Sequence, residues 1–366
     1  MTLRKLMARA LLVLGGLVGG LLAVEVGVRM GGLDPLVSQR GLLGAETRRG
    51  DCVQPAPYMG YELVPGGCGA NSLGFQDREP PASKPPDSKR VLVLGDSITE
   101  QRAYVEILEL MLGERLEAQV DVWNMGVTGY SVLNELEMLR HRALDLEPDL
   151  VVLQLCLNDF GVTPVLFEFQ GDLYWLRAAT GGMDRLGLWL FERSALARLI
   201  KLHSASKHMQ GLGDPAHEAR VSAALVEMQR LCQQRGVPFE VVLFPTLSPR
   251  DGWAASEEET YVRFVELAAT HGIPFTDLTP RMLGGPVDDL LRYRGDPVFA
   301  ELDSALDRWG LDPSVADLLQ GMDARMLGLG KNIQPHMYQD TTHPNFLGHY
   351  LAAEALVEKL ALQLEP

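Results

Sequence analysis

Four short segments, far apart in the chain, carry side chains that are able to form one hydrolytic site. They are Gly95–Ser97, Asn124–Gly129, Asn158–Asp159 and Asp340–His343. The serine of the first segment follows the apolar run 91–94, which predicts a buried parallel strand. A serine held where a strand ends and a helix begins is open to a substrate and lies near free backbone N–H groups. This placement suits a nucleophile.

The last segment holds the residue that is able to activate this serine. A serine hydroxyl is a weak nucleophile until a base within hydrogen-bond reach takes its proton. His343 is the candidate base, and Asp340 precedes it closely enough for its carboxylate to orient the imidazole in a tight turn. Alternatively, His343 only caps or packs beneath the final helix, which Pro344 and Asn345 open. The other three segments favour the base.

The order of these segments resembles that of the SGNH (GDSL-type) hydrolase family. In this family four sequence blocks supply a Ser, a Gly, an Asn and a His, which correspond here to Ser97, Gly129, Asn158 and His343. The Asp-x-x-His pair of the family is matched by Asp340 and His343. The resemblance implies a serine esterase with a Ser-His-Asp triad. It also implies an oxyanion hole that uses the backbone N–H groups of Ser97 and Gly129 and the side-chain amide of Asn158.

The resemblance covers about residues 91–362 and departs from the family pattern at two positions. Ile98 replaces a leucine, which is a conservative change. Cys156 stands where the family usually has a glycine, two residues before Asn158, and its side chain is able to crowd the floor of the pocket. Gly126 is the alternative to Gly129 as an oxyanion donor. Gly129 is preferred because the family glycine lies five residues after the asparagine of its block.

The sequence predicts neither a metal site nor a cofactor. His203 and His208 are not at the i, i+4 spacing of a helical metal pair, and no phosphate-binding loop or dinucleotide fingerprint is present. The Gly-x-Ser-x-Gly elbow of the α/β-hydrolases is also missing. Asp96 and Asp159 are expected to hold their loops through hydrogen bonds to the backbone.

Strands and helices alternate along the part of the chain that carries these segments. This pattern predicts a three-layer α/β/α sandwich around a mainly parallel, five-stranded sheet, as in SGNH and flavodoxin-like proteins. Ligands bind beyond the carboxyl ends of such strands, where Ser97, Gly129 and Asn158 are expected. The expected strands are 91–94, 120–124, 149–155, 239–244 and 274–276, and the expected helices are 100–117, 132–145, 217–235, 256–271 and 346–362.

The composition of the 366 residues fits a folded protein with a large core. Apolar residues make up 46% of the chain and charged residues 22%, so extensive disorder is not expected. The formal net charge is −15, which argues against a nucleic-acid partner because phosphate binding needs a basic face.

The N-terminus predicts one transmembrane helix. An uncharged run, 10–24, follows Arg4, Lys5 and Arg9 and precedes Glu25. Its 15 residues span about 22 Å, and the flanking apolar residues extend it toward the roughly 30 Å of a hydrocarbon core. The basic residues before the run place the N-terminus in the cytoplasm and the catalytic domain outside it, in the periplasm or at the cell surface. A cleaved signal peptide and a buried soluble helix are the alternatives.

We therefore predict three regions: a membrane anchor or signal (1–30), an extracytoplasmic strap with a Pro-rich linker (31–88), and the hydrolase domain (89–366). The last contains an aromatic-rich insertion at about 160–216, either a lid or wall beside the site or a satellite helical pair. Cys52 and Cys68 are able to pair in an oxidising compartment, or else remain surface thiols. The other two cysteines, Cys156 and Cys232, are expected as buried thiols.

These observations together predict a membrane-anchored serine esterase that acts through an acyl-enzyme. Its substrate is an ester of unknown identity, such as an O-acetyl or other acyl ester of an envelope carbohydrate or lipid. An O-acyltransferase for an envelope polysaccharide shares the first half-reaction and stays open as an alternative. A catalytically inactive binding module of the same fold is a further alternative, which the presence of Ser97, Asp340 and His343 disfavours.

Overall fold

The structure is a computed structural model in which the chain forms two compact units. One unit comprises residues 1–50 and 164–211, and the other residues 51–163 and 212–366. The described residues are 3–34, 45–48, 52–81, 83–161, 163, 165–169, 172–176, 185–205, 215–248, 250–283, 342–344 and 346–365. Each unit is considered by itself.

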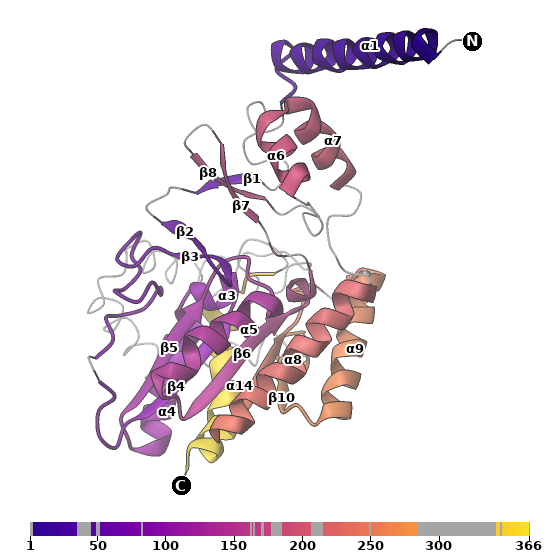
Figure 1. Cartoon of the computed structure of the whole chain (residues 1–366). Coiled ribbons are helices and arrows are strands. Elements are labelled where there is room, and N and C mark those ends of the chain that lie inside the picture. The colour runs from indigo at the N-terminus through magenta and orange to yellow at the C-terminus, as the bar shows by residue number, and fades with distance from the viewer. Residues whose placement is uncertain are drawn as a thin grey trace, which may run out of the picture. The chain divides into compact units, whose positions relative to one another are not determined.

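The larger unit is built on a five-stranded sheet in which every pair of neighbours is parallel (Figure 1). The strand order is β10-β9-β6-β4-β5. The central strands are mostly apolar and almost fully buried, as expected for strands that are covered on both faces. The five strands are β4 (Lys89–Gly95), β5 (Val120–Gly126), β6 (Leu150–Cys156), β9 (Phe239–Phe244) and β10 (Phe275–Asp277).

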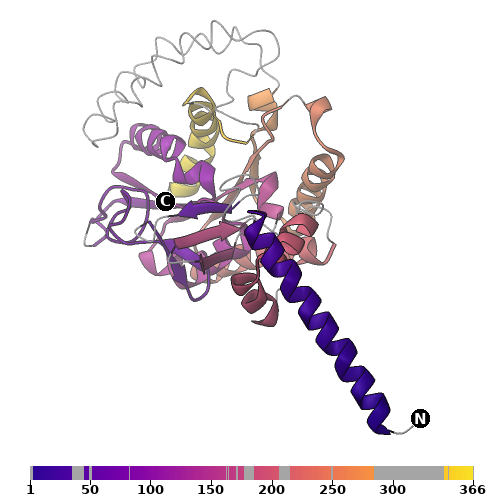
Figure 2. The same cartoon turned by 90° about the horizontal axis from the view of Figure 1, so that it is seen from above.

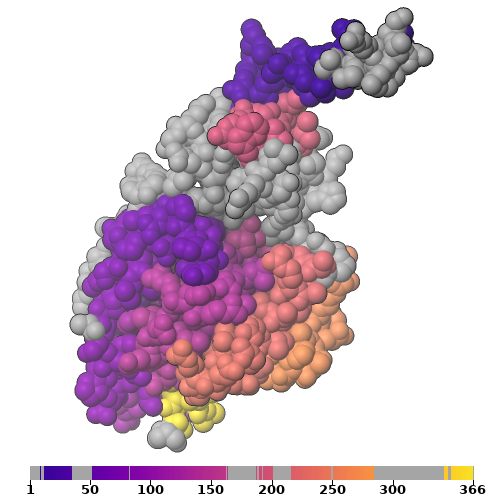
Figure 3. Space-filling view, viewed as in Figure 1, coloured from indigo at the N-terminus to yellow at the C-terminus, as the bar shows by residue number. Residues whose placement is uncertain are grey.

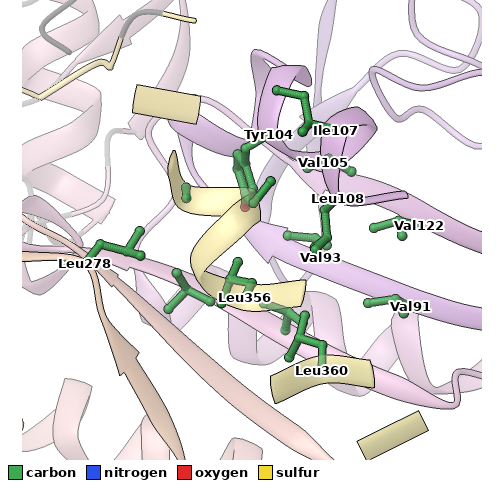
Figure 4. Packing of buried hydrophobic residues seen from close by; sticks show 14 of the residues in the cluster. Val91, Val93, Tyr104, Val105, Ile107, Leu108, Val122, Leu278, Leu356 and Leu360 are labelled. Atoms are coloured by element: carbon green, nitrogen blue, oxygen red, sulfur yellow. The ribbon is translucent and has the colours of Figure 1, made fainter. Parts of the chain in front are cut away.

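Helices cover both faces of this sheet, which confirms the three-layer prediction. On one face α4 (Ala103–Leu116) packs against the final helix α14 (Phe346–Leu364), and their apolar side chains meet those of β4 in a common core (Figure 4). The other face carries α5 (Val132–His141), α8 (Pro215–Arg235) and α9 (Ala255–His271). Burial of this many aliphatic side chains is the main source of stability.

The predicted helix at 100–117 is interrupted at its start. A separate single turn, α3 (Ser97–Glu100), leads from the end of β4, and α4 begins only at Ala103. Arg102 lies between them with a φ of 72°, which is incompatible with a continuous right-handed helix. The break leaves Ser97 in the first turn of α3, directly beyond the sheet.

The predicted strap and linker (31–88) are divided between the units: residues 51–88 belong to the larger unit, whereas 31–50 belong to the smaller one. A hairpin of β2 (Val53–Ala56) and β3 (Gly60–Leu63) is followed by a loop, and a disulfide joins Cys52 to Cys68. The loop is held by Asn71, whose side chain accepts the Phe75 N–H at 3.0 Å, and the Phe75 ring is buried. Figure 3 shows the violet surface of the strap against the rest of the unit. The predicted pairing of the cysteines is confirmed.

The smaller unit combines the N-terminal segment with the insertion. A three-stranded antiparallel sheet has the order β1-β8-β7, and helices α6 and α7 follow it along the chain. The elements are α1 (Leu3–Met30), β1 (Ala45–Arg48), β7 (Val165–Phe169), β8 (Asp172–Leu176), α6 (Arg185–Arg193) and α7 (Ala195–Ala205). The stretch Leu12–Met30 of α1 is long and apolar enough to cross a membrane. The insertion contains a helical pair, α6 and α7, as one alternative expected, but it also forms the β7–β8 hairpin, which was not expected.

Candidate active site

Ser97 lies in a tight turn that is built by its neighbours. Asp96 caps α3 and accepts the Ile98 N–H at 2.9 Å, while the Asp96 N–H donates to Gln154 Oε1 at 3.1 Å. Gly95 is required at the end of β4, because a Cβ there would lie 2.5 Å from the same Gln154 oxygen. The turn fixes the Ser97 side chain at the carboxyl end of the sheet.

His343 meets Ser97 across a long separation in sequence. The distance between Ser97 Oγ and His343 Nε2 is 2.8 Å, although the two residues are 246 positions apart. His343 lies just before α14, which is anchored in the core on the same face as α4. This is the geometry that a nucleophile and its base require. Asp340 lies outside the described residues.

A second histidine, His349, lies near His343 but is suited to a structural role. It is fully buried on α14, its ring stacks on Tyr104, and its Nε2 is 3.2 Å from Gln101 Oε1. Burial, together with the nearby His343, lowers the pKa of His349 to about 3. The ring is therefore neutral at physiological pH and packs the start of α14, which follows His343 in the chain.

The second segment places Gly129 in a turn with a positive φ and gives Gly126 a packing role. Gly129 has a φ of 82°, a conformation that favours glycine. Gly126 donates its N–H to Asn124 Oδ1 at 2.9 Å, so this N–H is already occupied. A Cβ at Gly126 would also lie 2.7 Å from the Thr99 carbonyl carbon, which indicates a packing role. Within the described part of the chain, the Gly129 N–H has no such partner.

Two tyrosines brace the backbone around Gly129. The Tyr61 hydroxyl donates to the Thr128 carbonyl at 2.9 Å, and the Tyr130 hydroxyl donates to the Tyr61 carbonyl at 2.5 Å. Glu100 accepts the Thr128 N–H. The turn is thus tied both to the strap and to α3. None of these contacts was expected from the sequence, since Tyr61 lies in a segment without a catalytic motif.

The third segment exposes Asn158 and buries its neighbours. Asn158 is solvent-exposed, whereas Cys156 and Asp159 are buried. The Cys156 N–H donates to Asp159 Oδ2 at 2.7 Å, and the Cys156 thiol contacts Asn158 Oδ1. Burial and the neighbouring Asp159 raise the pKa of the Cys156 thiol well above its usual value. The thiol therefore keeps its proton and is able to donate it to the amide oxygen.

Buried carboxyl groups lie beneath the site. Burial raises the pKa of Glu135 and of Asp159 well above the ordinary range, and the charge of Asp96 raises both further. Both groups favour the neutral form. Possible ligand atoms of Asp96, Cys156 and Asp159 lie within 4.8 Å of one another. However, one oxygen of each aspartate accepts a backbone N–H and the thiol is protonated, which suits a loop brace better than a metal site. The absence of a metal stays a prediction.

Comparison with known proteins identifies the family. The model of the GDSL-like lipase/acylhydrolase family matches residues 93–351, which is more than half of the chain and includes Ser97, Gly129, Asn158 and His343. The chain belongs to this family. It is therefore a GDSL-type hydrolase that acts on ester bonds, as the resemblance of the four segments predicted. No curated protein matches the chain significantly.

Several solved structures are similar to this GDSL-type hydrolase at low identity. A Bacteroides fragilis protein described as an acylhydrolase is 16% identical, with a TM-score of 0.40 and coverage of 78% of this chain and 92% of its own. An acetyl xylan esterase is 13% identical, with a TM-score of 0.41 and coverages of 74% and 99%. A lipase/acylhydrolase from Enterococcus faecalis is 14% identical, with a TM-score of 0.40 and coverages of 76% and 98%.

Proposed function

We propose that the protein is a serine esterase that forms an acyl-enzyme on Ser97. The observation that carries the proposal is the 2.8 Å distance between Ser97 Oγ and His343 Nε2 at the carboxyl end of the sheet. His343 takes the hydroxyl proton as Ser97 attacks the ester carbonyl, and returns it to the departing alcohol. A water molecule, activated by the same imidazole, then releases the acid. The sequence spacing supports Asp340 as the carboxylate that orients His343.

The oxyanion of the tetrahedral intermediate is stabilised by three donors in this proposal. They are the backbone N–H groups of Ser97 and Gly129 and the side-chain amide of Asn158. Gly129 has no side chain to shield its N–H, and Asn158 is exposed, so both donors are able to be approached by a substrate, which supports the assignment. Removal of one such donor typically lowers a rate about 10²–10³-fold.

The proposed substrate is an acyl ester of an envelope carbohydrate or lipid. In this proposal α1 is an uncleaved membrane anchor, and the larger unit lies outside the cytoplasm. The disulfide between Cys52 and Cys68 supports a location of the larger unit outside the cytoplasm, because disulfides persist in oxidising compartments.

Active-site labelling tests the nucleophile. We expect a fluorophosphonate probe to label the full-length protein, and Ser97→Ala to abolish both labelling and hydrolysis of a short-chain aryl ester. Ser88→Ala is a matched control, because Ser88 precedes the opposite end of β4 and only donates to the Pro85 carbonyl at 2.8 Å. The control should keep full activity. More than about a tenth of the parent activity in Ser97→Ala would refute the assignment.

The fate of the acyl group distinguishes hydrolysis from transfer. The acyl-enzyme formed from an aryl ester should release free acid at the same rate with and without an added polysaccharide. If the polysaccharide accelerates release and becomes acylated, the protein is an O-acyltransferase with the same nucleophile.

A further inference from the structure

The C-terminal part of α1 is joined to the start of α7 by one carboxylate. Glu25 accepts the backbone N–H groups of Ala195 and Leu196, each at 2.9 Å, and the Ser194 hydroxyl at 2.8 Å. A negative charge at a helix N-terminus satisfies free N–H groups and favours the helix dipole. Glu25, a residue of α1, therefore caps the N-terminus of α7. This contact fixes the position along α1 at which α7 begins.

Two further contacts hold α6 and α7 at the same place. The buried guanidinium of Arg198 pairs with buried Asp34 through two bonds, of 3.0 and 2.5 Å. Arg29 donates to the carbonyl of Arg193, the last residue of α6, at 2.6 Å. Glu25 and Arg29 lie in the last turns of α1 and Asp34 follows shortly after it, so all of these contacts join the helical pair to the C-terminal end of α1. Figures 1 and 2 both show the N-terminal half of α1 extending beyond the helical pair.

The attachment point coincides with the end of the apolar run of α1. Glu25 is the first charged residue after the run 10–24. If this run crosses a bilayer, Glu25 lies near the boundary between hydrocarbon and headgroups. The beginning of α7 and the end of α6 must then lie at the same depth, since their backbone groups are bonded to Glu25 and Arg29.

Helices α6 and α7 expose large apolar side chains at this level. Trp189, Leu190 and Ile200 are 49%, 40% and 61% exposed, although Phe191 beside them is buried. The guanidinium of Arg193 lies 5.1 Å from the centre of the Trp189 ring. A tryptophan beside an arginine is the combination that membrane interfaces favour, because both side chains have an apolar body and a polar end.

We propose that α6 and α7 form a second membrane contact, in which Trp189, Leu190 and Ile200 enter the phospholipid interface beside α1. The occupant is a bilayer rather than a protein, because the bonds to Glu25, Arg29 and Asp34 keep these side chains at the end of the apolar run. Burial of the side chains in the interface removes apolar surface from water. The proposal rests on the anchor role given to α1 above and is independent of the esterase chemistry.

Fluorescence quenching tests this contact in the full-length protein. The protein is reconstituted in vesicles of phosphatidylcholine and phosphatidylglycerol, with an environment-sensitive dye on one introduced cysteine. The test variants are Trp189→Cys and Ile200→Cys. Leu17→Cys reports insertion of α1, and Val262→Cys is the matched control, since Val262 is an exposed apolar residue of α9 in the other unit. Labelling is selective because Cys156 and Cys232 are buried and the other pair is bonded.

We expect nitroxide-bearing lipids to quench the dyes at 17, 189 and 200 at least about twofold more than the dye at 262. Aqueous iodide should show the opposite order. If position 17 is quenched by lipid while 189 and 200 behave like 262, the inference is wrong and the anchor stands. If position 17 is not quenched by lipid, the anchor and this inference both fail. Equal lipid quenching at all four positions would also overturn the inference, because it would reflect the dye alone.

Discussion

Cys156 is the residue at which this site departs most from the pattern of its family. Its thiol contacts the Asn158 amide oxygen and is held in the protonated form by burial. A thiol that donates to the oxygen leaves the NH2 group of the amide to face the substrate. Cys156 is thus a positioning residue for the proposed oxyanion donor, in place of the glycine that the family usually has.

Removal of this thiol should therefore lower kcat without a matching change in KM. One hydrogen bond contributes about 1 kcal/mol, so Cys156→Ala should lose about fivefold in kcat, and Cys156→Ser should recover most of it. Steady-state kinetics on an aryl ester provide the measurement. Cys232→Ala, which removes the other buried thiol, is the control and should keep its kcat. Unchanged kcat in Cys156→Ala would show that the thiol only fills space.

The types of the site residues could be predicted from the sequence, but not all of their roles. Ser97 and His343 belong to short motifs that predict a nucleophile and its base, and the structure brings the two side chains together. The choice between Gly126 and Gly129 required the fold, because only the fold shows that the Asn124 side chain occupies the Gly126 N–H. Local spacing carries no information about which backbone N–H groups remain free.

At the scale of elements, the strap acts on the site through Tyr61. Its hydroxyl bonds to the Thr128 carbonyl, one residue before Gly129. We expect Tyr61→Phe to cost about 1 kcal/mol of stability and to lower kcat several-fold, since the proposed donor becomes less well positioned. Tyr58→Phe is the control from the same hairpin, because Tyr58 is 62% exposed and stacks on His141. Equal kcat values for the two variants would contradict the bracing role.

A buried acid on α4 should make stability depend on pH. Burial raises the pKa of Glu106 to about 7, although its ion pair with Arg102 lowers it. The folded state then binds this proton more tightly than the unfolded state, so the contribution of Glu106 to stability is complete at low pH and is lost as pH rises from about 4.5 to 7.

The variant Glu106→Gln should weaken this dependence, because it removes the contribution of one buried acid and leaves those of Glu135 and Asp159. Its Tm should match the parent at pH 5 and exceed it at pH 8, in thermal unfolding followed by circular dichroism. Glu114→Gln, at an exposed position of the same helix, should change neither value. A lower Tm for Glu106→Gln at pH 8 would mean that its charge is stabilised by Arg102 in the folded state.

At the scale of the whole molecule, the sheet was predictable and the grouping of the insertion was not. Continuous apolar runs and alternating helices determine a parallel sheet locally, so all five strands were located from the sequence. By contrast, the unit that joins α1 to α6 and α7 depends on pairs such as Asp34 and Arg198, which are 164 positions apart. Such a pair has no local signature. The proposed domain boundaries at residues 30 and 88 stay predictions, because the local sequence pattern alone does not determine where a domain ends.

The oxidation state of the four cysteines depends on the cellular compartment in which the protein folds. Cys52 and Cys68 are bonded at a sequence separation of 16, and Cys156 and Cys232 are free and buried. A chain released from the envelope and denatured without reductant should therefore show two free thiols, and four after reduction. Four thiols before reduction would contradict both the bond and an extracytoplasmic position.

Since closure of such a loop contributes about 3 kcal/mol, the double substitution Cys52→Ala and Cys68→Ala should lower the free energy of unfolding by about that amount. Cys232→Ala is not a suitable control for stability, because it creates a cavity. The parent protein with added reductant is the suitable control, because it loses only the disulfide bond. Its free energy of unfolding in urea should match that of the double variant.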